Sequence, residues 1–116
     1  MEKRTGGCHC KAVRFVVEID LTKPVIECNC SHCQVKGMLL SFVPAGSFTL
    51  ESGEEALTEY RFNNKKIAHL FCKTCGVQSF GKGEGAEGPT VAINVRALDD
   101  IDMGTLVKNE FNGKDF

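Results

Sequence analysis

The sequence predicts an all-β fold, built mainly from short antiparallel sheets, in a single domain that spans residues 1–116. Many short apolar runs alternate with segments rich in Gly, Asn, Pro and Ser, a pattern typical of β-sandwiches and barrels. A chain of 116 residues is long enough to bury a modest core by itself. The apolar runs extend over only a few residues each, so none is expected to cross a bilayer.

The expected strands follow one another at short intervals. The first, Lys11–Glu18, alternates around Val13 and Phe15 and then continues apolar. Seven further runs are apolar or alternating, and turn residues separate them. They are Val25–Cys28, Met38–Val43, Phe48–Leu50, Thr58–Phe62, Ile67–Phe71, Val77–Phe80 and Thr90–Val95.

Three segments outside these runs have expected conformations of their own. Asn63–Asn64 predicts the tip of a hairpin, because Asn tolerates the backbone angles of tight turns. The Gly-rich segment 82–89 predicts a mobile loop. Residues 99–106 can form one or two short helical turns near the C-terminus.

The seven cysteines fall into three tight clusters, which is the spacing of metal ligands rather than of core residues. The clusters are Cys8 and Cys10, then Cys28, Cys30 and Cys33, then Cys72 and Cys75. An odd number of cysteines argues against a disulfide scaffold. The start M-E-K-R-T-G-G-C has no apolar run behind it, so we expect no secretory signal and a reducing, cytoplasmic location.

The charge balance restricts the partners of the protein. The net charge is -1, so the chain has no basic excess that would attract nucleic acid or an anionic membrane. We therefore expect no nucleic acid and no membrane as partners. As a separate expectation, the protein acts on a small molecule as a monomer or homodimer.

Cys72-Lys73-Thr74-Cys75-Gly76 is the strongest single motif. Two thiolates with a following glycine that can adopt a positive φ form a knuckle whose amides point at the sulfurs. Spacing allows a closed zinc site with either Cys30 and Cys33 or Cys8 and Cys10. We prefer Cys8 and Cys10, because the other choice leaves Cys8, Cys10 and Cys28 without a shared geometry.

Cys28, Cys30 and Cys33 would then form a second zinc site with an open fourth position, as in catalytic zinc centres. Three thiolates make zinc a poor generator of hydroxide, yet leave it able to bind a substrate thiol and remove its proton. His32 could move that proton, or it could close the site as a fourth ligand. His9 is expected to be exposed or beside the metal ligands, and His69 to be a strand residue without a chemical role.

Six segments resemble the glutathione-dependent formaldehyde-activating enzyme family, which includes the centromere protein V group. They are G-G-C-H-C-K-A-V-R-F, C-N-C-S-H-C, V-P-A-G-S-F, L-T-E-Y-R-F-N, F-C-K-T-C-G-V-Q-S-F and V-A-I-N-V-R-A-L-D, between about Gly6 and Asp99. One departure is Lys11, which stands where the family commonly has glycine after the first C-x-C, and which predicts a less tight knuckle.

The resemblance implies a β-tent fold and two Zn²⁺ ions per chain. It implies a structural zinc on Cys8, Cys10, Cys72 and Cys75, and a catalytic zinc on Cys28, Cys30 and Cys33 that meets the sulfur of glutathione. The expected activity is that of a carbon–sulfur lyase acting on a glutathione-like thiol and an aldehyde such as formaldehyde, or on their S-hydroxymethyl adduct. The alternative is a non-catalytic, zinc-stabilised module that binds another protein.

Overall fold

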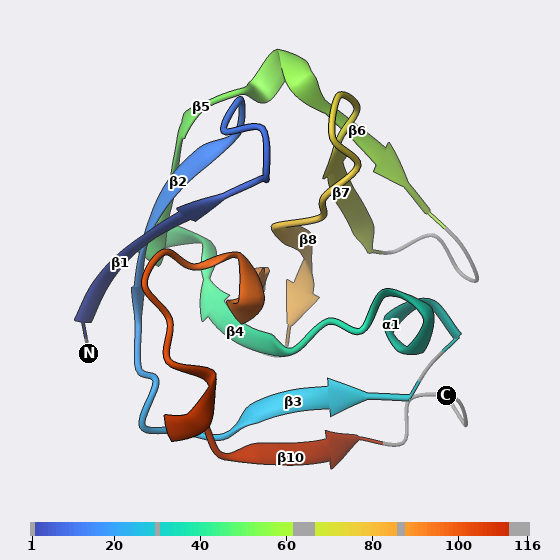
Figure 1. Cartoon of the computed structure of the whole chain (residues 1–116). Helices are drawn as coiled ribbons and strands as arrows, with labels where there is room; N and C mark the ends of the chain where they lie inside the picture. The colour runs from blue at the N-terminus through green and yellow to red at the C-terminus, as the bar shows by residue number, and fades with distance from the viewer. Residues whose placement is uncertain (1, 30, 62–66, 86–87, 112–116) are drawn as a thin grey trace.

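The computed structural model describes residues 2–29, 31–61, 67–85 and 88–111, and these form ten strands (Figure 1). The strands are β1 Glu2–Gly7, β2 Arg14–Ile19, β3 Val25–Cys28, β4 Leu40–Pro44, β5 Phe48–Ser52, β6 Leu57–Tyr60, β7 Ala68–Cys72, β8 Phe80–Gly85, β9 Gly88–Asn94 and β10 Lys108–Phe111. The helix α1 covers Ser31–Lys36, and single 3-10 turns cover Ala45–Ser47 (η1), Glu54–Ala56 (η2), Val95–Ala97 (η3) and Met103–Thr105 (η4). No helix in the described ranges has the length and apolar character needed to cross a membrane.

The strands form two sheets, which confirms the predicted all-β class. The smaller sheet has the order β1-β2-β5, and the larger has the order β10-β3-β4-β9-β8-β7-β6. Neighbouring strands are antiparallel except β10 and β3, which pair in parallel from Lys108↔Val25 to Phe111↔Cys28. Antiparallel pairing between neighbours in the chain, as in β6–β7 and β7–β8, needs only short connections.

The hydrophobic core lies between the two sheets. Alternate residues of β2 point inward, so Phe15, Val17 and Ile19 are buried while Glu18 is exposed. The Phe48 ring centroid of β5 lies 5.2 Å from that of Phe15 and 4.7 Å from that of Phe80 in β8. These three aromatic rings therefore join the smaller sheet to the larger one, at distances typical of tilted and edge-on aromatic pairs.

The described residues of the Gly-rich segment 82–89 lie in strands, contrary to the prediction of a loop. Residues 82–85 belong to β8 and residues 88–89 belong to β9, which pair from Phe80↔Ile93 to Gly85↔Gly88. Backbone hydrogen bonds to β9 stabilise the extended conformation that glycine by itself does not favour. The expected hairpin tip at Asn63–Asn64 lies outside the described residues, although β6 and β7 pair antiparallel on either side of it.

Two of the short helical elements bear on the sequence predictions. The turn η4 lies within residues 99–106, where the sequence predicts it, and the Asp102 side chain accepts a hydrogen bond from the Gly104 amide at 3.0 Å. The six-residue helix α1 was not predicted. It falls in the second cysteine cluster, where ligand spacing masked any helical pattern.

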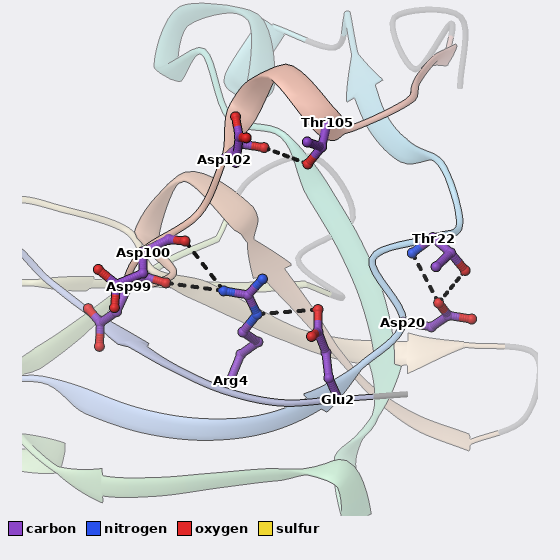
Figure 2. Close-up of polar contacts among 8 residues, drawn as sticks. All are labelled: Glu2, Arg4, Asp20, Thr22, Asp99, Asp100, Asp102 and Thr105. Carbon is purple, nitrogen blue, oxygen red and sulfur yellow. Dashed lines mark hydrogen bonds and ion pairs between the residues drawn. The ribbon is translucent and has the colours of Figure 1, made fainter.

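Polar contacts attach the chain after β9 to the smaller sheet (Figure 2). Arg4 of β1 reaches the carbonyl oxygens of Asp99 and Asp100, each at 3.5 Å, and its Nε lies 3.3 Å from a Glu2 carboxylate oxygen. Arg14 of β2 makes a two-pronged ion pair with the Asp99 carboxylate, and the Thr5 hydroxyl donates to the same carboxylate at 2.7 Å. The hydrogen bond from Arg14 is the main reason that the pKa of Asp99 is lowered.

We expect the Arg14–Asp99 pair to make a small, salt-sensitive contribution to stability. A double-mutant cycle with Arg14→Gln and Asp99→Asn should give a coupling free energy of unfolding of about 0.2–1 kcal/mol, because both groups are partly exposed to water. Chemical denaturation of metal-loaded protein measures it. The coupling should shrink in 1 M salt; a coupling that salt leaves unchanged would contradict this assignment.

Candidate metal centres

Two knuckles at the ends of strands bring four cysteines together. Cys8 and Cys10 follow β1, whereas Cys72 ends β7 and Cys75 comes three residues later. In Figure 1 the loops after β1 and β7 both lie toward the top of the molecule. Their ligand sulfurs all lie within 4.8 Å of one another, so Cys8, Cys10, Cys72 and Cys75, hereafter the four-cysteine group, could hold a metal ion.

The first knuckle is closed by backbone hydrogen bonds around Cys8. The Cys8 amide donates to the Val13 carbonyl at 3.1 Å, and the Val13 amide donates to the Cys8 sulfur at 3.3 Å. The chain passes so close to itself here that a Cβ on Gly7 would lie 2.0 Å from the Val13 carbonyl oxygen. Only glycine therefore fits immediately before Cys8.

The second knuckle repeats this design. The Cys72 amide donates to the Val77 carbonyl at 3.0 Å, five residues ahead, as Cys8 does to Val13. The Gly76 amide donates to the Cys72 carbonyl at 2.7 Å, and Gly76 has φ of 81°, the left-handed conformation predicted for it. In the first knuckle the left-handed residue is Lys11, with φ of 69°. A lysine there is strained because its Cβ crowds the backbone.

The sulfur separations fit a tetrahedral metal. Cys10 Sγ lies 3.6 Å from Cys8 Sγ and 3.6 Å from Cys72 Sγ. Four sulfurs at the usual zinc–sulfur distance would be separated by about 3.8 Å. Cys8 and Cys72 are buried while Cys10 is exposed, so such an ion would lie at the edge of the core.

Electrostatics also favour a cation among these sulfurs. Backbone N–H groups of Cys10 and Val77 lower the pKa of Cys75 to about 6, and the backbone N–H of Cys75 lowers that of Cys72. The Ala12 amide acts in the same direction on Cys10, but the sulfurs of Cys8, Cys72 and Cys75, with desolvation, raise its pKa to about 11. Four adjacent thiols cannot all ionise unless a positive charge joins them.

The second cluster is described in part. Cys28 ends β3 and Cys33 lies in α1, while Cys30 lies outside the described residues. Cys28 and Cys33 share a small apolar cluster with Met38 and Leu40. They also line a cavity of about 550 Å³, with Glu27, Asn29, Gln34, Gly37, Met38 and Glu110. We refer to Cys28, Cys30 and Cys33 as the three-cysteine group.

His32, between Cys30 and Cys33 in sequence, faces the strand that leads to the second knuckle. Its ring centroid lies 4.0 Å from that of His69 in β7 and 6.0 Å from that of Tyr60 in β6. Burial, then the nearby His69 and Lys36, lower the pKa of His32 to about 4. The imidazole is therefore neutral at neutral pH. His9, by contrast, is exposed.

Two residues of this neighbourhood were not anticipated as site residues. His69 was expected to be a strand residue without a role, yet it contacts His32. Lys36 donates a hydrogen bond to Gln78 Oε1 at 2.9 Å and lies over the Phe71 ring, 5.2 Å from its centroid. A helical pattern over residues 31–36 would have indicated Lys36, because it places Lys36 on the same face as His32. His69 lies in β7, and only the tertiary structure brings it to His32.

The sequence model of one family, described as glutathione-dependent formaldehyde-activating enzyme, matches residues 3–112. The chain belongs to this family. The match includes all seven cysteines, since they lie between residues 8 and 75. The structure is also similar to the crystal structure of a Rhodobacter sphaeroides protein from a structural genomics programme. The TM-score is 0.79 and the identity 27%, over 91% of this chain and 97% of that chain. Membership in the formaldehyde-activating family associates the protein with the chemistry of glutathione and formaldehyde.

The left-handed conformation of Lys11 gives a direct test of the first knuckle. Lys11→Gly should raise the free energy of unfolding by about 0.5–1 kcal/mol, because glycine adopts positive φ without steric strain. Lys11→Ala is the matched control, since it removes the same charge and retains a Cβ. Chemical denaturation of the three metal-loaded proteins compares them. Equal stabilisation by both substitutions would assign the gain to charge rather than to conformation.

Removing a ligand from the four-cysteine group should destroy the fold. Cys72→Ser leaves three sulfurs for the ion and places a hydroxyl in a fully buried position. We expect this variant to unfold or aggregate, as judged by circular dichroism and size-exclusion chromatography. Val35→Ser, at an exposed position of α1, is a control for an added hydroxyl. A folded Cys72→Ser protein with unchanged metal content would contradict the assignment.

Proposed function

We propose that the protein is a zinc-dependent carbon–sulfur lyase that acts on a glutathione-like thiol and an aldehyde, or on their S-hydroxymethyl adduct. The observation that carries this proposal is the family match over residues 3–112, which spans both cysteine groups. Formaldehyde is the aldehyde that the family description favours. We further propose that the protein works in the cytoplasm, as a monomer or homodimer, without nucleic-acid or membrane partners.

In this proposal the four-cysteine group holds a structural zinc. Its four protein sulfurs would supply all the ligands that a structural zinc takes, which would leave no position for a substrate. The ion would attach the first knuckle, after β1, to the second knuckle, after β7. Binding would thus stabilise the pairing of segments that are 62 residues apart in sequence.

The three-cysteine group would hold the second zinc, with fewer protein ligands than a tetrahedron requires. Supporting this, Cys28 and Cys33 line one cavity of about 550 Å³, a size that suits a small-molecule ligand. When bound there, zinc would take the substrate sulfur as a further ligand and favour its thiolate form. The remaining tasks, which are to orient the thiol and move its proton, fall to the protein.

The reaction needs one proton transfer in addition to the new bond. The thiol sulfur attacks the carbonyl carbon, the carbon–sulfur bond forms, and the carbonyl π electrons move to oxygen. The proton lost by the thiol is returned to that oxygen, which gives an S-hydroxymethyl adduct. His32, which precedes Cys33 in the chain, would accept the proton and return it, either directly or through water. The reverse sequence releases the aldehyde.

Exchange NMR tests the activity. Free glutathione and formaldehyde exchange with their S-hydroxymethyl adduct even without protein. We expect the zinc-loaded protein to make this exchange faster than the uncatalysed rate under the same conditions. Metal-depleted protein and Cys33→Ser protein serve as comparisons. If exchange with intact, two-zinc protein is no faster than without protein, the lyase proposal fails for this pair of substrates.

Metal counting tests the division into two groups. Cys30→Ser should reduce the zinc content from two ions per chain toward one while the fold is retained, because the structural ion stays in the four-cysteine group. Native mass spectrometry and circular dichroism report the two properties. Global unfolding of Cys30→Ser would count against the division. A wild-type protein with only one zinc would favour the non-catalytic binding module.

A further inference from the structure

The helix that carries Cys33 docks on the strand that ends in Cys72. His32 and Lys36 lie four residues apart and share one face of α1. His69 and Phe71 lie two residues apart and share one face of β7. The two pairs meet, since the ring centroids of His32 and His69 are 4.0 Å apart and Lys36 Nζ lies 5.2 Å from the Phe71 ring centroid.

The neighbouring strands complete this contact. Tyr60 of β6 is the register partner of His69, so both side chains project from the same face of the sheet. The Tyr60 and His32 rings are nearly parallel, at 20°, with centroids 6.0 Å apart. From beyond the second knuckle, Gln78 accepts a hydrogen bond from Lys36 at 2.9 Å. Helix α1 is thus held at two points, one at each end of its six residues.

A six-residue helix cannot maintain its position by its own stability. Isolated helices shorter than about 12 residues are marginal in water, so tertiary contacts must fix α1. Of its described residues, only Cys33 is buried. Besides the burial of Cys33 itself, the contacts of His32 and Lys36 hold α1, and with it the Cys33 sulfur, beside Cys28.

We propose that His69 is a positioning residue for the three-cysteine group, acting through His32 to hold α1 so that Cys33 and Cys28 can bind one zinc ion. The inference rests on the proposed function, because it requires a second metal. It assigns a role to a strand residue that belongs to neither cysteine group. Since β7 continues directly into Cys72, the four-cysteine group anchors the strand from which His69 acts.

Stepwise metal titration tests this role. Competition with a chromophoric zinc chelator gives the affinity of each equivalent, and cobalt substitution reports each centre through its thiolate-to-cobalt absorption. In His69→Ala we expect the affinity for the first equivalent of zinc to be unchanged. The second equivalent should bind about tenfold more weakly, which is typical of losing a residue that orients a metal ligand. His69→Phe, which retains a ring against His32, should recover part of the loss.

The control is Lys82→Ala on the adjacent strand β8. Lys82 pairs with Ala68, so it projects from the face opposite to that of His69, and we expect both equivalents to remain at wild-type affinity. Second-equivalent affinity at wild-type level in folded His69→Ala would overturn the positioning role alone. Equal weakening of both equivalents, or unfolding of both His69 variants, would also overturn it, because His69 would then serve the fold as a whole. A wild-type protein that binds one equivalent would instead refute the two-zinc function on which the inference rests.

Discussion

The convergence of four sulfurs from two knuckles is the constraint on which the rest of the structure depends. Cys8 and Cys10 follow an edge strand of the smaller sheet, whereas Cys72 ends a strand of the larger one and Cys75 comes after it. The four sulfurs nevertheless lie within 4.8 Å of one another. A structural zinc contributes on the order of 10–16 kcal/mol in small modules, comparable to the stability of a whole domain. The rings of Phe15, Phe48 and Phe80 then join the sheets by ordinary packing.

The two cysteine groups differ in their surroundings. In the four-cysteine group every sulfur comes from a knuckle that backbone hydrogen bonds brace, and the four sulfurs together could hold a metal ion. The described part of the three-cysteine group combines a strand end with a short helix, and it borders a cavity. Helix α1 packs against β7 through His32 and Lys36, and β7 ends at Cys72 of the four-cysteine group.

Much of the fold and of the candidate site could be predicted from the sequence because its signals are local. The strand Val25–Cys28 was predicted with its observed bounds, since apolar side chains and flanking turn residues define it. The positive φ of Gly76 follows from the needs of a C-x-x-C-G knuckle. Other features involve partners far along the chain. The polar strand β1 and strand β10 were not predicted. Each is a strand because it pairs with a neighbour, β1 with β2 and β10 with β3, and not because its own residues favour one.

The sequence by itself therefore determined the all-β class, the three cysteine clusters and the family, because each depends on residue type and spacing. Tertiary structure decided which residues meet. It converted the Gly-rich segment 82–85 into a strand by pairing it with β9, and it placed Lys11 in a left-handed turn. It also set His69 against His32 across 37 residues of chain. Neither local propensity nor motif spacing predicts such contacts, because they form only when α1 packs against β7.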